Sequence, residues 1–223
     1  MIKGLIFDFD GLILDTETPA FQGWQGVFER HGCTLTLEMW ADCIGRAQDA
    51  FDPRDHLETC LGRSIDRARV LAEEQKRESE LIRNQALLPG VLETIEAGEK
   101  RGLKLGVASS SDRAWVNAYL SRFGLIERFD AIRCVDDVAH AKPAPDLYLA
   151  VLQALDLRPD EAIAFEDSPN GVLAAKRARV FCVAVPNRLT KQLSFDHAAD
   201  LTVASLKQIV LAELLEAAGK RGP

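Results

Sequence analysis

The sequence predicts an α/β fold in which a parallel sheet carries helices on both faces. After Pro89 and Gly90, short apolar runs alternate with stretches of helical character, and strands separated by helices of about ten residues pair in parallel. The first strand-like run, residues 2–7, is followed instead by helical sequence as far as residue 84. The chain has 223 residues, which at about 150 residues per domain leaves room for one core with a helical insertion.

The elements of the predicted core follow from their apolar runs. Predicted strands cover residues 2–7, 103–109, 131–135, 162–167 and 180–185. Predicted helices cover residues 113–123, a stretch through Tyr148 and Leu152, a stretch through Leu173 and a C-terminal stretch from Leu206 to Leu214. The predicted core domain therefore consists of residues 1–15 and 85–223, and residues 16–84 form an inserted helical domain.

The inserted segment has the apolar spacing of helices. Phe21, Trp24, Val27 and Phe28 recur at intervals of three and four residues, which predicts a helix over residues 17–31 that ends at Gly32. Trp24 and Trp40 are expected to pack in a core rather than to contact substrate. Between Arg63 and Arg83, six basic residues mix with five acidic ones, a pattern typical of a solvated helix surface.

Composition and charge narrow the class of protein. The chain is 47% hydrophobic and 27% charged, with a net charge of −7, which favours an ordinary globular protein over one that binds nucleic acid or an anionic membrane. We find no signal peptide and no apolar run near the ~20 residues that span a bilayer. The five cysteines are widely spaced without a C-x-x-C pair, so we expect reduced structural thiols and a cytoplasmic location.

Four polar signals fall at the carboxyl ends of predicted strands or in the loops beside them, the edge where an open parallel sheet binds ligands. They are Asp8 and Asp10 in DFDGLILD, Ser109 followed by Ser110, Lys142 in AKPAPD, and the pair Glu166-Asp167. Each signal alone also fits a turn or a helix cap. Together they predict that carboxylates, a hydroxyl and a lysine meet at one edge of the sheet.

At these residues the chain resembles the haloacid dehalogenase (HAD) superfamily. DFDGLILD, a strand leading to Ser109, Lys142 in a KPxPD context, and Glu166-Asp167 followed by SPNG are similar, in order, to the four motifs of that superfamily. The resemblance covers almost the whole chain and implies a Rossmann-like parallel sheet with an inserted α-helical cap. It is strongest to the subgroup of small-metabolite phosphatases and β-phosphoglucomutase.

The resemblance implies a role for each motif residue. Asp8 is the expected nucleophile, which forms an aspartyl-phosphate and divides one difficult displacement into two easier ones. Asp10 is the expected general acid and base. Mg²⁺ prefers hard oxygen ligands, so its expected ligands are the Asp8 carboxylate, the Asp10 backbone carbonyl and Asp167, with Glu166 bound directly or through water.

Further residues are expected to hold the phosphoryl group. Lys142 offsets the negative charge of the phosphate, and Ser109 and Ser110 donate hydrogen bonds to its oxygens. Arg46 is the candidate substrate contact in the insertion. The implied activity is Mg²⁺-dependent hydrolysis of a small phosphorylated metabolite, either a phosphosugar or a phosphoglycolate-like acid, by a monomeric enzyme.

Three other functions fit the sequence less well than the phosphatase. A β-phosphoglucomutase-type phosphotransferase fits Trp24, but Ala20 stands where that type carries a histidine in its hinge. A non-catalytic regulator would be expected to lose motif residues, and all of them are present. A phosphonate-cleaving relative needs a lysine in the cap, yet none occurs between Lys3 and Lys76.

Overall fold

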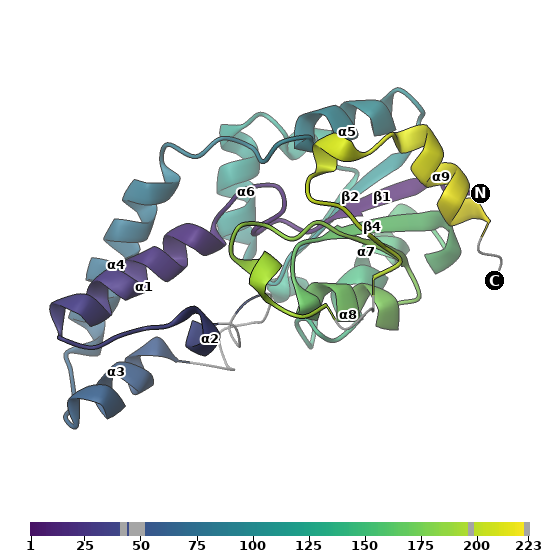
Figure 1. Ribbon diagram of the computed structural model, residues 1–223. Helices are drawn as coiled ribbons and strands as arrows, with labels where there is room; N and C mark the ends of the chain where they lie inside the picture. Colours follow the sequence, from purple (N-terminus) through teal and green to yellow (C-terminus); the bar gives the residue numbers. More distant parts are fainter. Residues whose placement is uncertain (41–43, 45–51, 196–198, 221–223) are drawn as a thin grey trace.

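The predicted α/β fold is confirmed by the structure, a computed structural model that describes residues 1–40, 44, 52–195 and 199–220. Within these residues, six strands form one parallel sheet in the order β3-β2-β1-β4-β5-β6 (Figure 1). The strands are β1 Gly4–Phe7, β2 Lys104–Ala108, β3 Ala131–Arg133, β4 Ala162–Glu166, β5 Phe181–Ala184 and β6 Leu201–Thr202. The five predicted strands are therefore present, each slightly shorter than its apolar run.

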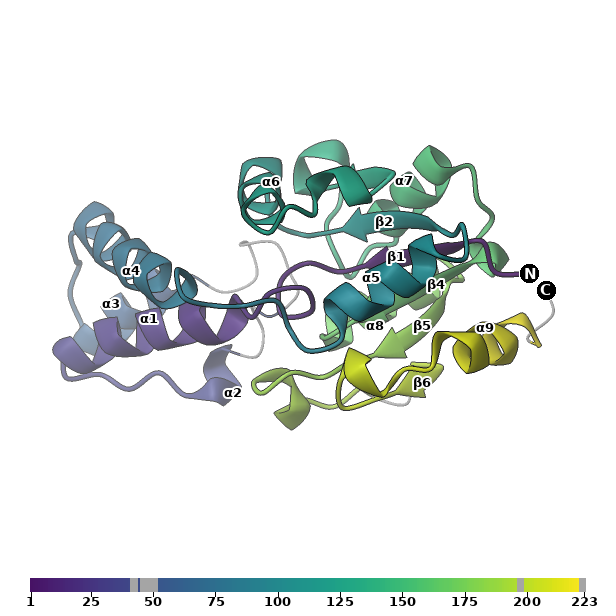
Figure 2. The same ribbon diagram turned by 90° about the horizontal axis from the view of Figure 1, so that it is seen from above.

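Helices cover both faces of the sheet, as the alternating pattern predicts (Figure 2). One face packs against α5 (Val91–Glu99), α6 (Arg113–Arg122) and α9 (Leu211–Gly219), and the other against α7 (Asp146–Leu155) and α8 (Pro169–Arg177). The strands alternate their side chains between the two cores: Phe7 belongs to the first and Ile6 to the second, both fully buried. Gly106 allows α7 to approach β2, because a Cβ there would lie 2.5 Å from Val151 Cγ1.

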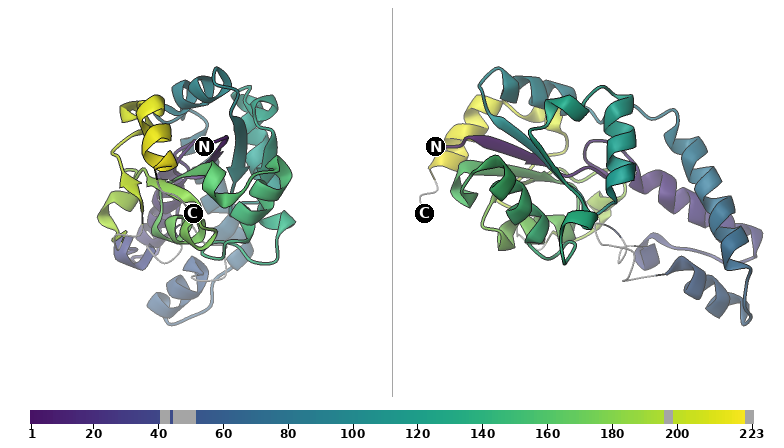
Figure 3. Two further views of the ribbon diagram at one scale, coloured as in Figure 1. Left: turned by 90° about the vertical axis from the view of Figure 1, so that its right-hand side faces the viewer. Right: turned by 180° about the vertical axis from the view of Figure 1, so that it is seen from behind.

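Between β1 and α5 the described chain forms a helical insertion outside the sheet. It contains α1 (Glu17–Arg30), α2 (Leu37–Trp40), α3 (Pro53–Leu61) and α4 (Arg67–Ile82). These helices lie beyond the carboxyl ends of the strands, and the views of Figure 3 agree on this placement. Trp24 and Trp40 are each 6% exposed in a separate apolar cluster, which confirms that they pack in a core.

The insertion contacts the sheet domain at several described places, among them the Arg122 side chain of α6, which donates to the Ile82 and Arg83 carbonyls at 3.2 and 2.7 Å. Leu189, in the segment after β5, is buried in the apolar cluster of the insertion. The Asn170 side-chain amide, in the first turn of α8, donates a hydrogen bond of 2.9 Å to the Ile44 carbonyl. The insertion therefore packs directly over the strand ends that carry the four motifs.

One expectation for the insertion was wrong, and another holds except at one residue. Cys33 and Cys60 form a disulfide, although their spacing of 27 residues gave no signal for one; the packing of α1 and α3 brings their Cα atoms to 6.4 Å. Cys134 and Cys182 are free and buried as expected, and Cys43 lies outside the described residues. The charged stretch of α4 is not solvated throughout, because Glu74 is only 3% exposed against α1.

Two elements were not predicted. Helix α5 follows Pro89 and Gly90 directly, and the edge strand β6 has only two residues, both exposed. The C-terminal stretch begins as a short 3₁₀ turn at Leu206–Gln208 before α9 starts at Leu211. None of the described helices is both long and apolar enough to cross a membrane.

Candidate active site

The sheet register brings the strand ends together. Phe7 of β1 pairs with Val107 of β2 on one side and with Phe165 of β4 on the other. Asp8 follows β1 and its amide donates to the Phe165 carbonyl at 3.0 Å. Ser109 and Asp167 follow the neighbouring strands by one residue each, so the polar residues of three motifs begin at one edge.

A buried lysine joins two of the motif carboxylates. Lys142 Nζ lies 2.7 Å from Asp8 Oδ1 and 2.6 Å from Glu166 Oε1, and all three side chains are almost fully buried. The Tyr148 hydroxyl of α7 donates to Glu166 Oε1 at 2.5 Å. Burial opposes the charge on Lys142, but the carboxylates of Asp8 and Glu166 outweigh it and raise the lysine pKa above its ordinary value.

Three carboxylates could hold a divalent cation. Asp8, Glu166 and Asp167 each offer an oxygen within 4.8 Å of the others. Burial, followed by the charge of Glu166, raises the pKa of Asp8 to about 8, and burial followed by the charge of Asp8 raises the pKa of Asp167. Crowded, buried oxygen ligands with excess negative charge fit Mg²⁺, a hard cation that takes carboxylates.

Asn187 and Gly11 lie against the Asp167 carboxylate and help to hold it in place. The Asn187 side-chain amide donates to Asp167 Oδ2 at 2.7 Å and to the Gly11 carbonyl at 3.2 Å. Gly11 has a φ of +79°, and a Cβ there would lie 2.3 Å from Asp167 Oδ2, so the turn after Asp10 requires glycine. Asn187 was not predicted. Like the residues of the other motifs, it lies just after the carboxyl end of a strand, here β5.

The Asp10 carboxylate accepts hydrogen bonds at both oxygens. Oδ1 accepts from Thr16 Oγ1 at 2.7 Å and from the Trp115 indole nitrogen at 3.0 Å. Oδ2 accepts from Ser111 Oγ at 2.6 Å and from Ser109 Oγ at 3.3 Å. Thr16, Ser111 and Trp115 were not predicted, because each reads in the sequence as part of a helix start.

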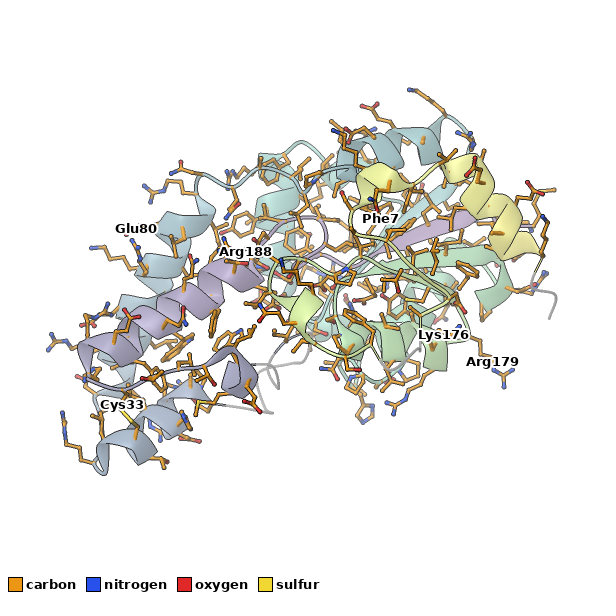
Figure 4. All side chains as sticks on the ribbon, in the orientation of Figure 1. Phe7, Cys33, Glu80, Lys176, Arg179 and Arg188 are labelled. Atoms are coloured by element: carbon orange, nitrogen blue, oxygen red, sulfur yellow. A yellow bond between two sulfur atoms is a disulfide. The ribbon has the colours of Figure 1, made fainter. Side chains whose placement is uncertain are left out.

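The candidate phosphate contacts lie beside this group. Ser109 is fully buried and its Oγ accepts from the Ser111 amide at 3.0 Å. Ser110 Oγ is buried without a hydrogen-bond partner in the described part of the chain. Arg46 lies outside the described residues. Arg188 is exposed where the insertion meets the sheet domain, whereas Cys33 lies in the insertion far from the sheet (Figure 4).

The insertion adds acidic side chains near Asp10. Burial, followed by the charge of Asp10, raises the pKa of Glu17 to about 8 and that of Glu78 to about 7. Both groups are half-buried. The raised pKa values of Glu17 and Glu78 indicate that further negative charge is unfavourable on the side of the site that faces α1 and α4.

Comparisons with known proteins agree with this geometry. Residues 5–185 match the model of the haloacid dehalogenase-like hydrolases. The chain is 43% identical over 216 residues to YhcW of Bacillus subtilis (strain 168), named provisionally as a phosphatase, with 97% of each chain covered. It is 30% identical to hexitol phosphatase B of Escherichia coli (strain K12), over 96% of this chain and 97% of that protein.

A solved structure shares the fold over the same extent. The crystal structure of CbbY from Rhodobacter sphaeroides in complex with phosphate superposes with a TM-score of 0.75 at 28% identity, covering 96% of this chain and 99% of CbbY. The family match, the relatives and the fold therefore agree with the resemblance drawn from the four motifs. The chain belongs to the haloacid dehalogenase-like hydrolases.

Proposed function

We propose that this protein is a Mg²⁺-dependent phosphatase that hydrolyses a small phosphorylated sugar or sugar alcohol through an aspartyl-phosphate on Asp8. Its family and its phosphatase relatives make it a phosphoric monoester hydrolase. The observation that carries the mechanism is the Asp8 carboxylate, held by Lys142 at 2.7 Å within a buried cluster of oxygen ligands.

Asp8 fits the role of nucleophile. Its Oδ2 makes no hydrogen bond among those found in the described residues, while Lys142 holds Oδ1. The ammonium keeps one oxygen in place and favours the ionised form that attacks phosphorus. Mg²⁺ held by Asp8, Asp167 and the Asp10 carbonyl would supply positive charge that offsets the carboxylates and the transferring phosphoryl oxygens.

Asp10 fits the role of acid and base. In the first step Asp8 forms a bond to phosphorus, the ester O–P bond breaks, and the Asp10 carboxyl gives its proton to the leaving alcohol. In the second step Asp10 takes a proton from water, whose oxygen attacks phosphorus as the bond to Asp8 breaks. Ser109, Ser110 and Lys142 would hold the phosphoryl oxygens through both steps.

The substrate class follows from the relatives and from the insertion. Hexitol phosphatase B and the Thermotoga maritima phosphorylated carbohydrates phosphatase, 32% identical over 80% of this chain, are named for phosphorylated polyols and carbohydrates. We propose that residues 16–84 act as a cap over a core of residues 1–15 and 85–223, with Arg46 as a substrate contact. A compact cap suits a small substrate, and a phosphoglycolate-like acid is the alternative of similar size outside the carbohydrates. The monomeric state and the cytoplasmic location stay predictions.

The experiment that tests this proposal is a phosphate-release screen over a panel of phosphometabolites, with and without Mg²⁺. Asp8→Asn is expected to abolish turnover and phosphoenzyme formation with no loss of melting temperature. Asp156→Asn, an exposed position at the end of α7, is the matched control and should keep full activity. Substantial phosphatase activity in the Asp8 variant would reject the mechanism, and conversion of β-glucose 1-phosphate without phosphate release would favour the phosphotransferase.

A further inference from the structure

Trp115 stands at a fixed position in the first turn of α6. Asp112 caps this helix by accepting from the Trp115 amide at 2.8 Å. The indole packs edge-to-face on Tyr119, with ring centroids 4.8 Å apart, and Tyr119 in turn packs near Phe9 at 6.4 Å. Backbone capping and aromatic packing therefore hold the indole in one orientation, with its N–H directed at Asp10 Oδ1.

The four donors around Asp10 differ in what they can do. The hydroxyls of Thr16, Ser109 and Ser111 can each turn and accept a hydrogen bond instead of donating one. The indole N–H of Trp115 can only donate. Among the hydrogen bonds that the structure gives Asp10, only the one from Trp115 therefore requires its partner oxygen to remain an acceptor.

We propose that Trp115 is a positioning residue for the acid–base chemistry of Asp10. Its N–H holds Oδ1 as the acceptor oxygen. This leaves Oδ2, which lies on the side of Ser109 and Ser111, to face the phosphoryl group that the proposed function places beside Ser109. Oδ2 then gives a proton to the leaving oxygen as its bond to phosphorus breaks, and takes one back from the attacking water. This inference rests on the proposed role of Asp10.

The leaving group of the substrate separates positioning of the acid from a general structural role. Release of 2,4-dinitrophenolate needs no proton, whereas release of phenolate from phenyl phosphate depends strongly on one. Rapid-mixing measurements of the first release of phenolate report phosphoenzyme formation alone. Trp115→Phe keeps an aromatic ring and removes the N–H, so it is expected to slow this step about 10- to 100-fold for phenyl phosphate. For 2,4-dinitrophenyl phosphate, the same variant is expected to slow this step by less than about threefold.

Two further variants make the result decisive. Tyr119→Phe keeps the indole and should leave both rates within about twofold of wild type. Asp10→Asn should show the same leaving-group selectivity as the Trp115 variant, but larger. If Asp10→Asn shows no selectivity, the proposed acid role of Asp10 is wrong, whatever Trp115 does.

The role of Trp115 would be overturned if Trp115→Phe slowed phosphoenzyme formation equally with both esters, or with neither. If that variant fails to fold, benzothienylalanine at position 115 keeps the shape of the indole and replaces its N–H by sulfur. That substitution must reproduce the selective loss with phenyl phosphate. Wild-type rates from the benzothienyl protein would overturn the proposal.

Discussion

Lys142→Met tests the charge arrangement at the centre of the site. Lys142 Nζ lies 2.7 Å from Asp8 and 2.6 Å from Glu166, which corresponds to about 6 kcal/mol of attraction for each pair at an effective dielectric constant of about 20. Desolvation of the buried charges offsets several kcal/mol of this attraction. Because the substitution leaves two buried carboxylates without their cation, we expect the free energy of unfolding to fall by about 3–5 kcal/mol.

Urea unfolding at pH 7 in EDTA measures this loss, and a second substitution identifies its cause. Glu166→Gln removes one of the two unpaired charges while keeping an oxygen for the Tyr148 hydroxyl, so the double variant should recover at least half of the lost stability. Phosphatase activity should stay about 100-fold or more below wild type in both variants, because neither supplies a cation to the phosphoryl oxygens.

Two outcomes would refute this reasoning. A loss below about 1 kcal/mol in the Met variant would show that the ion pairs are balanced by desolvation. A double variant no more stable than the single one would show that packing, rather than unpaired charge, causes the loss. Recovery of activity in the double variant would leave Lys142 with a structural role alone.

Three other predictions concern pH, metal and the disulfide. Burial raises the pKa of Glu74 from its ordinary 4.5 to about 8, so its neutral form supports folding below pH 4.5 and that support is lost as the pH rises to 8. Glu74→Gln should therefore raise the free energy of unfolding in urea by about 1–3 kcal/mol over wild type at pH 8 and by little at pH 4.5, unlike the control Glu29→Gln at an exposed position. Equal effects at both pH values would contradict this. Because Asp8 and Asp167 both have raised pKa values and must lose their protons to bind a cation, calorimetry should show Mg²⁺ affinity rising at least about tenfold per pH unit between pH 6 and 8. A constant affinity would contradict the assignment. Reduction of the disulfide, or Cys33→Ala with Cys60→Ala, should lower the free energy of unfolding by about 3.5 kcal/mol for a bridge spanning 27 residues. An unchanged melting temperature would contradict this.

The fold was predictable from the sequence where burial is continuous along an element. β1, β2, β4 and β5 are buried over nearly their whole length, so their apolar runs extend no more than two residues beyond the strands at either end. The edge strand β6 has two exposed residues, and an apolar run cannot mark it. The disulfide and the burial of Glu74 depend on which helices of the insertion meet, which local spacing does not encode.

The residues of the candidate site also divide into those that the local sequence marks and those that depend on tertiary packing. The motif residues were found because each of them stands at a strand end or beside one, and parallel strands carry those positions to one edge. Trp115 and Thr16 escaped because their contacts with Asp10 exist only once α6 and the start of α1 lie beside the loop after β1. Asn187 lies just after β5, so the strand-end argument also applies to it.

The electrostatics of the pocket link its stability to its ligands. Among the described residues, the three buried carboxylates of Asp8, Glu166 and Asp167 lie close together, and the Lys142 ammonium pairs with the first two. The raised pKa values of Asp8 and Asp167 are consistent with an arrangement that opposes full ionisation. The apolar cores on both faces of the sheet must therefore stabilise the fold against the charge repulsion at its edge. A divalent cation bound at this cluster would relieve that repulsion, and because it would bind only the folded chain, each tenfold excess over its dissociation constant would add about 1.4 kcal/mol of stability. On the proposed function, the same excess negative charge that weakens the fold would favour a divalent cation at the site.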